Sequence, residues 1–360
     1  MSVDLTRQRE LAQLLAADGA HIPRDGFSKE YLAAMEGFLR TQWQVMPAAI
    51  VATFGTLRST AIPLSLRDRC VASYHLSRVQ NAVTKDVVEE FLAVGVDYCL
   101  LKGTASRWAC YDDPCLRSGF DIDIGLNKRD VTVAREVVER MGFIQSVWRA
   151  DEKRFVRATS EERKWVEDHH YELGYLIRRQ SVRDVSEEDK QSILATLDHT
   201  PNPWHLSSEG GLCVYLNVDL HHGLSHDVPL GPVLADSVMK IGLRLPSVAW
   251  QLFHLVFKIY WEGVHNYGKG LYQFGDLCRL WGHVSEDEFQ TFIGLVEGWN
   301  LEAGSFYVLG RLPRTFGIAL GDFAENYLCT LGVAKRKELP GRSNDLGDMW
   351  PKLWGVRSLC

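Results

Sequence analysis

Two aspartates, Asp121 and Asp123, stand two residues apart in the apolar run Phe120-Asp121-Ile122-Asp123-Ile124. In a strand, side chains alternate between faces, so both carboxylates would share one face and the apolar residues the other. Two anions about 7 Å apart at the backbone repel each other unless they are solvated or a cation lies between them. Mg²⁺ is the natural cation, because it binds through one or two carboxylates together with substrate phosphates. The pair therefore predicts a metal site, and a solvated edge strand is the alternative.

A third carboxylate is found in a second strand-like run. From Val214 to Leu220 the apolar residues occupy every second position, which leaves Asp219 on the other face with Tyr215 and Asn217. Asp219 is therefore a candidate to complete a two-metal site. The alternative is a polar residue on an exposed strand face.

The turn Lys102-Gly103-Thr104 is a candidate phosphate-binding segment. It follows the apolar run Tyr98 to Leu101 and precedes an expected helix from Ala105 to Cys110. A glycine at a strand-to-helix turn lets a phosphate approach the backbone, and the helix N-terminus offers free N–H groups. The segment is not a Walker A loop, because GxxxxGK[ST] is absent.

Charged and imidazole side chains elsewhere are candidates for substrate contact. Arg117 lies four residues before Asp121, so it is expected to pair with the carboxylates or to contact a triphosphate. His254 and Lys258 share a helix face; Lys258 could reach a phosphate, with a surface charge as the alternative.

Two histidine pairs are less specific. His170 precedes the expected strand Tyr171 to Ile177, which carries Glu172, and His221 follows the candidate Asp219 directly. A structural histidine is the favoured interpretation for His170, with substrate contact second. We treat His170, Glu172, His221 and His254 as candidate substrate contacts.

The elements that must position these residues follow from apolar periodicity. Residues before 95 read as helices (Leu5 to Leu15, Tyr31 to Val45, Leu66 to Leu92), and residues 97 to 222 alternate short strands with helices such as Val131 to Met141. Helical spacing returns in Val248 to Trp261, Leu271 to Trp281, Glu286 to Trp299 and Phe316 to Leu331. The polar residues from Lys335 predict a loosely held tail.

Composition excludes several classes of protein. The 360 residues are 46% apolar and 24% charged, an ordinary globular composition. The net charge of −6 gives no global basic field, so a nucleic-acid partner would need a local basic patch. No apolar run approaches the roughly 20 residues that span a bilayer, so we expect a cytoplasmic protein without membrane contact. The eight cysteines show no zinc spacing and are expected to be reduced.

The order of these motifs resembles the nucleotidyltransferase superfamily of the DNA polymerase β type, and more narrowly a bacterial group known only as uncharacterised nucleotidyltransferases. The resemblance is carried by Lys102-Gly103, the segment Tyr111 to Pro114, Arg117, and the Asp121/Asp123 strand. Asp219-Leu220-His221-His222 matches a later acidic-Leu-His segment, and His254, Lys258 and Asp276-Leu277 echo a C-terminal helix. The superfamily's turn is usually Gly-Gly or Gly-Ser, whereas this chain has Gly103-Thr104.

The resemblance implies an α/β (α+β) fold with a nucleotidyltransferase-like mixed sheet. The expected domains are an N-terminal helical region (1–95), a catalytic core (96–230), a C-terminal helical domain (231–334) and a polar tail (335–360), with the site between the core and the C-terminal helices. The implied reaction moves a nucleoside monophosphate from an NTP to an acceptor and releases pyrophosphate. ATP is the default donor.

The resemblance also implies roles for the residues. Asp121 and Asp123 would hold two Mg²⁺ ions, and Asp219 would share one metal and take the acceptor proton. The β- and γ-phosphates would be held by Lys102, Gly103 and Thr104, and Arg117 would offset charge on the leaving pyrophosphate. We expect Asp121→Asn and Asp123→Asn to abolish turnover with the fold intact, because removing one crowded carboxylate relieves repulsion.

The acceptor and the activity itself leave alternatives open. A small molecule or a peptide suits the net charge of −6 best. A tRNA end is the alternative, with Arg178, Arg179, Arg183, Lys335 and Arg336 as the basic rim that it would need. A catalytically silent binding module that keeps only the fold is the third possibility. The sequence specifies neither the base nor the oligomeric state.

Overall fold

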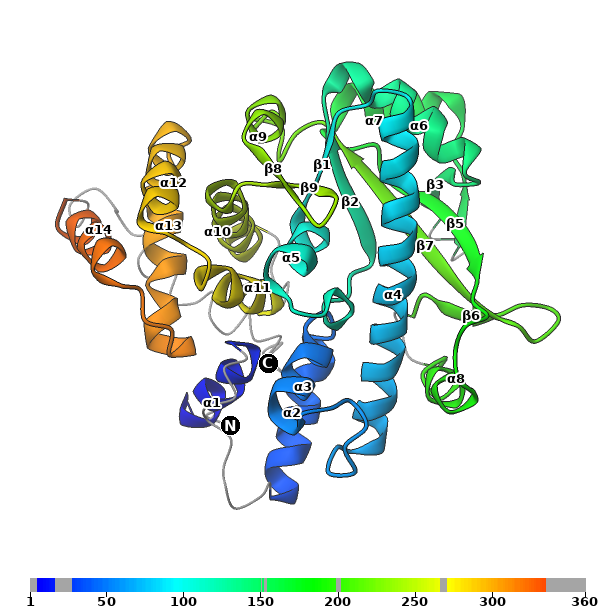
Figure 1. The fold of residues 1–360 in the computed structure, drawn as a ribbon, viewed down its shortest axis with the longest axis horizontal. Coiled ribbons are helices and arrows are strands. Elements are labelled where there is room, and N and C mark those ends of the chain that lie inside the picture. Colours follow the sequence, from blue (N-terminus) through cyan, green and yellow to red (C-terminus); the bar gives the residue numbers. More distant parts are fainter. Residues whose placement is uncertain are drawn as a thin grey trace. The chain divides into compact units, whose positions relative to one another are not determined.

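The chain folds into two compact units, one continuous in sequence and one built from two segments. A computed structural model describes residues 5–16, 28–149, 151, 154–198, 202–265 and 271–334. The continuous unit runs from Val71 to Ser247, and the other combines Met1–Cys70 with Val248–Cys360. Figure 1 shows the elements of both units, most of them labelled.

The continuous unit is built around a mixed sheet, to which the described residues contribute seven strands. Six strands follow the order β1-β2-β7-β5-β3-β4, and β6 pairs with β7. A separate two-stranded hairpin joins β8 to β9. The strands are β1 (Tyr98–Leu100), β2 (Asp121–Leu126), β3 (Ile144–Arg149), β4 (Arg154–Arg157), β5 (Leu176–Ser181), β6 (Trp204–Leu206), β7 (Leu212–His221), β8 (Ser237–Lys240) and β9 (Leu243–Pro246).

The two faces of this sheet differ in character because apolar and polar residues alternate along its central strands. In β7 the side chains of Val214, Leu216, Val218 and Leu220 are fully buried on one face, which forms the core. Ile122 and Ile124 of β2 are buried in the same way. The opposite face, which we call the site face, therefore carries the polar residues of both strands.

Helices complete the continuous unit. The long helix α4 runs alongside the sheet in Figure 1 and is bonded to it where Trp204 Nε1 of β6 donates to the Ala72 carbonyl at 3.2 Å. Helix α6 buries Ala134, Val137 and Val138. The helices are α4 (Leu64–Ala93, whose first residues belong to the other unit), α5 (Lys102–Cys110), α6 (Val131–Arg140), α7 (Ser160–His169), α8 (Glu187–Leu194) and α9 (Gly231–Ala235), with short 3₁₀ turns at Pro114–Leu116 and Lys128–Asp130.

The two-segment unit is helical throughout its described residues. Its two segments are joined where Arg279 Nη1 donates to the Leu15 carbonyl at 2.7 Å, and the core of the second segment includes Phe289, Phe292 and Phe316. The helices are α1 (Leu5–Ala16), α2 (Lys29–Thr41), α3 (Met46–Phe54), α10 (Val248–His265), α11 (Tyr272–Trp281), α12 (Glu286–Gly298), α13 (Glu302–Leu309) and α14 (Asp322–Ala334), with a π-helical turn at Leu312–Phe316.

The mixed α/β architecture is confirmed, with three local corrections. The strand expected from Tyr171 begins only at Leu176, because Gly174 takes φ 73° and interrupts the extended backbone. The hairpin of β3 and β4 was not predicted. The helix expected from Phe316 begins at Asp322, after Gly317 and Gly321 with positive φ.

Further expectations can be compared with the described part of the chain. None of its helices combines the length and apolar character that crossing a bilayer requires. Its seven cysteines are free thiols, as expected. The polar tail, with Lys335 and Arg336, lies outside the described residues. The predicted domain boundaries stay a prediction.

Candidate active site

The parallel pairing of β2 with β7 brings the predicted carboxylates together. The register places Asp123 opposite Asp219 and Asp121 opposite Asn217, all on the site face. Asp123 and Asp219 are 3% and 8% exposed, and Asp121 is half-buried. Three carboxylates of the sequence-predicted site therefore lie on two neighbouring central strands.

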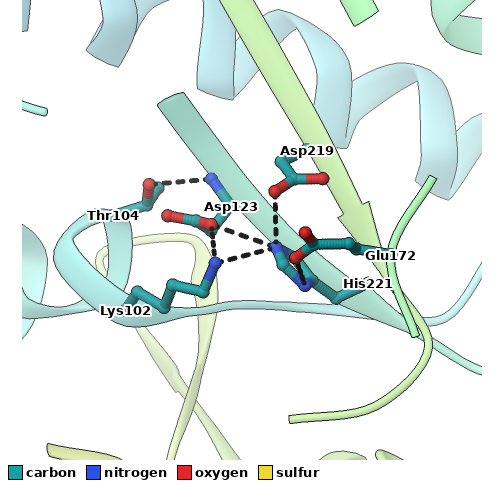
Figure 2. Close-up of polar contacts among 6 residues, drawn as sticks. All are labelled: Lys102, Thr104, Asp123, Glu172, Asp219 and His221. Carbon is teal, nitrogen blue, oxygen red and sulfur yellow. Dashed lines mark hydrogen bonds and ion pairs between the residues drawn. The ribbon is translucent and has the colours of Figure 1, made fainter. Parts of the chain in front are cut away.

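His221 lies between two of these carboxylates (Figure 2). Its Nε2 is 3.0 Å from Asp123 Oδ1 and 3.2 Å from Asp219 Oδ2, while its Nδ1 is 3.4 Å from Glu172 Oε2. Burial opposes a charge on this ring, but the neighbouring Asp219 and Asp123 outweigh burial and raise the pKa of His221 to about 9. The acidic cluster therefore favours the charged form of the His221 ring.

Lys102 supplies a second cation to the same cluster. Its Nζ lies 2.7 Å from Asp123 Oδ1 and 3.2 Å from His221 Nε2. Burial disfavours the ammonium, yet Asp123 and Asp219 raise the pKa of Lys102 well above its usual range. Lys102 also takes φ 48°, a left-handed conformation that costs a lysine about 1 kcal/mol.

The two aspartates of β2 have opposite electrostatic environments. Burial and the charge of Asp123 raise the pKa of Asp121 to about 7. Burial acts in the same direction on Asp123, but Lys102 and His221 outweigh it and hold the pKa of that carboxyl far below its usual range. Asp123 is thus the firmly ionised anion of the pair, and Asp121 titrates near neutrality.

The turn into α5 packs directly against β2. Thr104 is buried, and its Oγ1 accepts a hydrogen bond from the Asp123 backbone N–H at 3.0 Å. A Cβ on Gly103 would lie 2.7 Å from Arg117 Nη2, so glycine is needed for the close approach of this buried guanidinium. Arg117 also donates to the Ser118 carbonyl. No side chain caps the N-terminus of α5.

A second buried arginine lies behind the turn and was not predicted. Arg107 of α5 donates to Asn81 Oδ1 at 3.1 Å and to Gln80 Oε1 at 3.2 Å, both on α4. Burial and the nearby Arg117 lower the pKa of Arg107 to about 10. The sequence signal that could have indicated a buried polar partner such as Arg107 is the pair Gln80 and Thr84. These two polar residues lie four positions apart on the buried side of α4.

The remaining predicted residues are placed differently. Glu172 joins the cluster through His221, with which it also forms an isolated β-bridge. His170 is the C-cap residue that follows α7, and it packs on other rings, 5.1 Å from Trp165 and 6.1 Å from His226 between centroids. His254 and Lys258 lie on α10 of the other unit, and their approach to a nucleotide stays a prediction.

The donor set fits a divalent cation. One ligand atom from each of Asp123, Asp219 and His221 can be chosen so that all lie within 4.8 Å of one another. Asp219 Oδ1 is buried and has no hydrogen-bond partner among the described residues. A buried carboxylate oxygen without a partner is costly, and a metal ion would satisfy it. Asp121 stands beside this group on the same face.

Comparison with known protein families agrees with this geometry. The model of a family described as uncharacterised nucleotidyltransferase matches residues 51–317, which include every cluster residue described above. The chain belongs to this family. A search of curated proteins finds no match. This nucleotidyltransferase therefore has a family-level activity, nucleotidyl transfer, and a buried Asp-Asp-His group with which it could hold a metal ion.

Proposed function

We propose that this nucleotidyltransferase moves a nucleoside monophosphate from an NTP, with ATP as the default donor, to a small-molecule or peptide acceptor. The observation that carries the proposal is the Asp123-His221-Asp219 cluster on adjacent parallel strands. A family match alone gives the reaction class, whereas this cluster offers a place for a metal ion at a buried carboxylate oxygen that has no hydrogen-bond partner among the described residues.

Different residues of the site would bind the metal and the phosphates. Asp121, Asp123 and Asp219 would hold Mg²⁺, two ions in the full site, with His221 as a further ligand or as the cation that the metal displaces. When bound, the metal supplies Lewis-acid stabilisation of charge on the phosphates. The uncapped N-terminus of α5 at Gly103 and Thr104, with Lys102 and Arg117, would bind the β- and γ-phosphates.

The group transfer itself needs one base. The acceptor oxygen attacks the α-phosphorus and loses its proton to the Asp219 carboxylate. The new bond joins the acceptor oxygen to the α-phosphorus. The bond from the α-phosphorus to the bridging oxygen breaks, and pyrophosphate leaves with that electron pair.

One of the arginines expected in a tRNA-binding rim has other contacts. The tRNA alternative needs a basic rim, and Arg178 was one of the expected contributors. Arg178 instead donates to the Met141 carbonyl at 2.9 Å and lies 4.5 Å over the Phe143 ring. Arg178 therefore belongs to the packing around the end of α6.

Thermal shifts test the donor site directly. The wild type and Asp121→Asn are melted with each of ATP, GTP, CTP and UTP, in Mg²⁺ and in EDTA. A ligand at about 100 times its Kd stabilises by roughly 2.7 kcal/mol, a readily measured shift. We expect a shift that needs both Mg²⁺ and Asp121, and that persists in Asp112→Asn, a matched change of an exposed aspartate. No shift with any nucleotide would support the silent-module alternative instead.

A further inference from the structure

The site face continues beyond the carboxylates into a row of exposed aromatic rings. Tyr175, Phe155 and Trp148 are 49%, 43% and 50% exposed. Their rings touch edge to face, with centroids 5.0 Å apart between Tyr175 and Phe155 and 5.1 Å apart between Phe155 and Trp148. We call these three residues the aromatic row. Contiguous exposed apolar surface is a feature of ligand-binding and protein-binding sites.

The strand register places the start of the aromatic row beside Asp219. Leu176 of β5 pairs with Val218 of β7, and both side chains are fully buried in the core. Tyr175 precedes Leu176 and Asp219 follows Val218, so in this antiparallel pair both point to the site face. Consistent with this position, burial and the charges of Asp219 and Asp121 raise the pKa of the Tyr175 hydroxyl.

The same reasoning carries the row across β3 and β4. The Tyr175 carbonyl accepts from Ser146 N–H at 2.8 Å, which aligns Ser146 with Tyr175. Trp148, two residues on, lies on the same face and pairs directly with Phe155 of β4. Because neighbouring strands lie about 4.8 Å apart, the aromatic row covers roughly 10 to 15 Å of the site face, starting beside Asp219. The row and the carboxylates therefore form one continuous surface.

The charged side chains around the aromatic row favour a ligand with an uncharged ring over a polyanionic ligand. Arg149 points to the other face of β3 and pairs with Glu162, and Arg178 is engaged with Met141. Arg157 is the exposed arginine of β4 that shares the face of Phe155. Aromatic side chains gain most from stacking against flat-faced rings. Among the described residues, Arg157 is the cation beside the three rings, and Arg179 lies farther along the same face of β5. Two separated cations do not provide the electrostatic track that a polynucleotide requires.

We propose that the aromatic row of Tyr175, Phe155 and Trp148 is the acceptor subsite, which binds a small molecule whose flat-faced aromatic or sugar ring stacks there while its hydroxyl reaches Asp219. The inference rests on the proposed function and names its acceptor class. The hydroxyl oxygen forms the new bond to the α-phosphorus, its proton passes to Asp219, and pyrophosphate leaves.

The test separates the acceptor subsite from the donor site. The full-length protein is incubated with Mg²⁺ and ATP labelled at the α-phosphorus, first alone and then with an ultrafiltered small-molecule cell extract. Release of labelled AMP without extract measures transfer to water, which needs the donor site but no acceptor. Labelled products formed with extract are identified by mass spectrometry. The variants are Phe155→Ala, Trp148→Ala and, as a matched control, Tyr215→Ala, an exposed tyrosine farther along the same face.

We expect a labelled product that contains a hydroxyl-bearing ring. Phe155→Ala and Trp148→Ala should lower kcat/KM for the acceptor at least tenfold and leave ATP hydrolysis unchanged, which also shows that both variants are folded. Tyr215→Ala should behave as the wild type.

Four results would overturn the inference. The first is an equal loss of kcat/KM for the acceptor in Tyr215→Ala, and the second is a raised KM for ATP in Phe155→Ala, which would mean that the nucleobase occupies the aromatic row. The third is ATP hydrolysis with no labelled small-molecule product. The fourth is transfer of the label to added tRNA alone. Each of these leaves nucleotidyl transfer standing. Absence of both hydrolysis and product in the wild type overturns the proposed function, and the inference with it.

Discussion

Asp121 and Asp123 share one face of β2, two residues apart, yet their pKa values move in opposite directions. Asp123 contacts both cations of the cluster, Lys102 at 2.7 Å and His221 at 3.0 Å. Asp121 instead experiences burial and the negative charge of Asp123. The sequence treats the two residues as equivalent, whereas the structure makes one an ion-pair partner and the other a source of repulsion.

Asparagine substitutions should therefore differ in stability although both abolish turnover. Asp123→Asn leaves two buried cations without their shared anion, so we expect a loss of about 3 kcal/mol in EDTA. Asp121→Asn relieves repulsion and should be at least as stable as the wild type. Urea unfolding in EDTA at neutral pH measures both. Equal effects of the two substitutions would contradict the assignment of Lys102 and His221 to Asp123.

The stability gain of Asp121→Asn should depend on pH. The carboxyl ionises near pH 3.8 when unfolded and near 7 when folded, so the folded wild type binds the extra proton between these values. Its contribution to stability falls as pH rises through that window. The advantage of Asp121→Asn over the wild type should thus be absent near pH 4 and full by about pH 8. A constant difference across this range would refute the raised pKa.

Lys102→Met should increase the affinity for Mg²⁺ in the absence of nucleotide. Lys102 neutralises Asp123 and competes with a metal for the same oxygen. Without it the variant should be less stable in EDTA and should gain more stability from Mg²⁺ than the wild type does. Melting curves across a Mg²⁺ titration measure both effects. Lys190→Met is the control: this partly exposed lysine forms an ion pair with Glu187, and the variant should match the wild type.

Gly103→Ala should weaken nucleotide binding more than it weakens the fold. The new Cβ would lie 2.7 Å from Arg117 Nη2, so the guanidinium must move away from the turn. We expect about a tenfold rise in the Kd for NTP, or about 1.4 kcal/mol. Calorimetric titration measures it. Gly231→Ala, whose Cβ meets nothing within 4 Å, should leave the affinity unchanged, and an equal loss there would remove Arg117 from the binding site.

Glu172→Gln should reduce activity through His221. The carboxylate lies 3.4 Å from Nδ1 and orients the ring whose Nε2 faces Asp123 and Asp219. Removing the partner of a metal-site histidine typically costs 10- to 100-fold in metal affinity or activity, and we expect the lower end because Glu172 is partly exposed. The Kd for Mg²⁺ and kcat both measure this loss. Glu161→Gln, at an exposed carboxylate of α7, is the control.

Local periodicity predicted the elements that carry the carboxylates. The alternation in β2 and β7 depends on burying one face, and that signal is present within six to ten residues. The pairing of Asp123 with Asp219 is not local, because nothing within either strand specifies which neighbour it will have. The hairpin of β3 and β4 escaped prediction because Trp148 and Phe155 are exposed rings among arginines, which hides the apolar alternation.

The place of His221 on the site face follows from the alternation of β7, and its expected role as a substrate contact stays a prediction. The alternation that put Asp219 on the site face extends two residues further to His221. The sequence could not predict that Lys102 lies close to Asp123 and His221. That contact requires the left-handed turn into α5, which residue type alone does not favour for lysine.

The division of the chain into one continuous and one two-segment unit has a consequence for biosynthesis. Residues 71–247 emerge from the ribosome as a single stretch, and they include every member of the Asp123-His221-Asp219 cluster. The first 70 residues, by contrast, emerge early and must wait for helices beyond residue 247 before their unit is complete. Domains generally fold as units during synthesis. The strands that carry this cluster are therefore assembled while the amino-terminal helices still lack their packing partners.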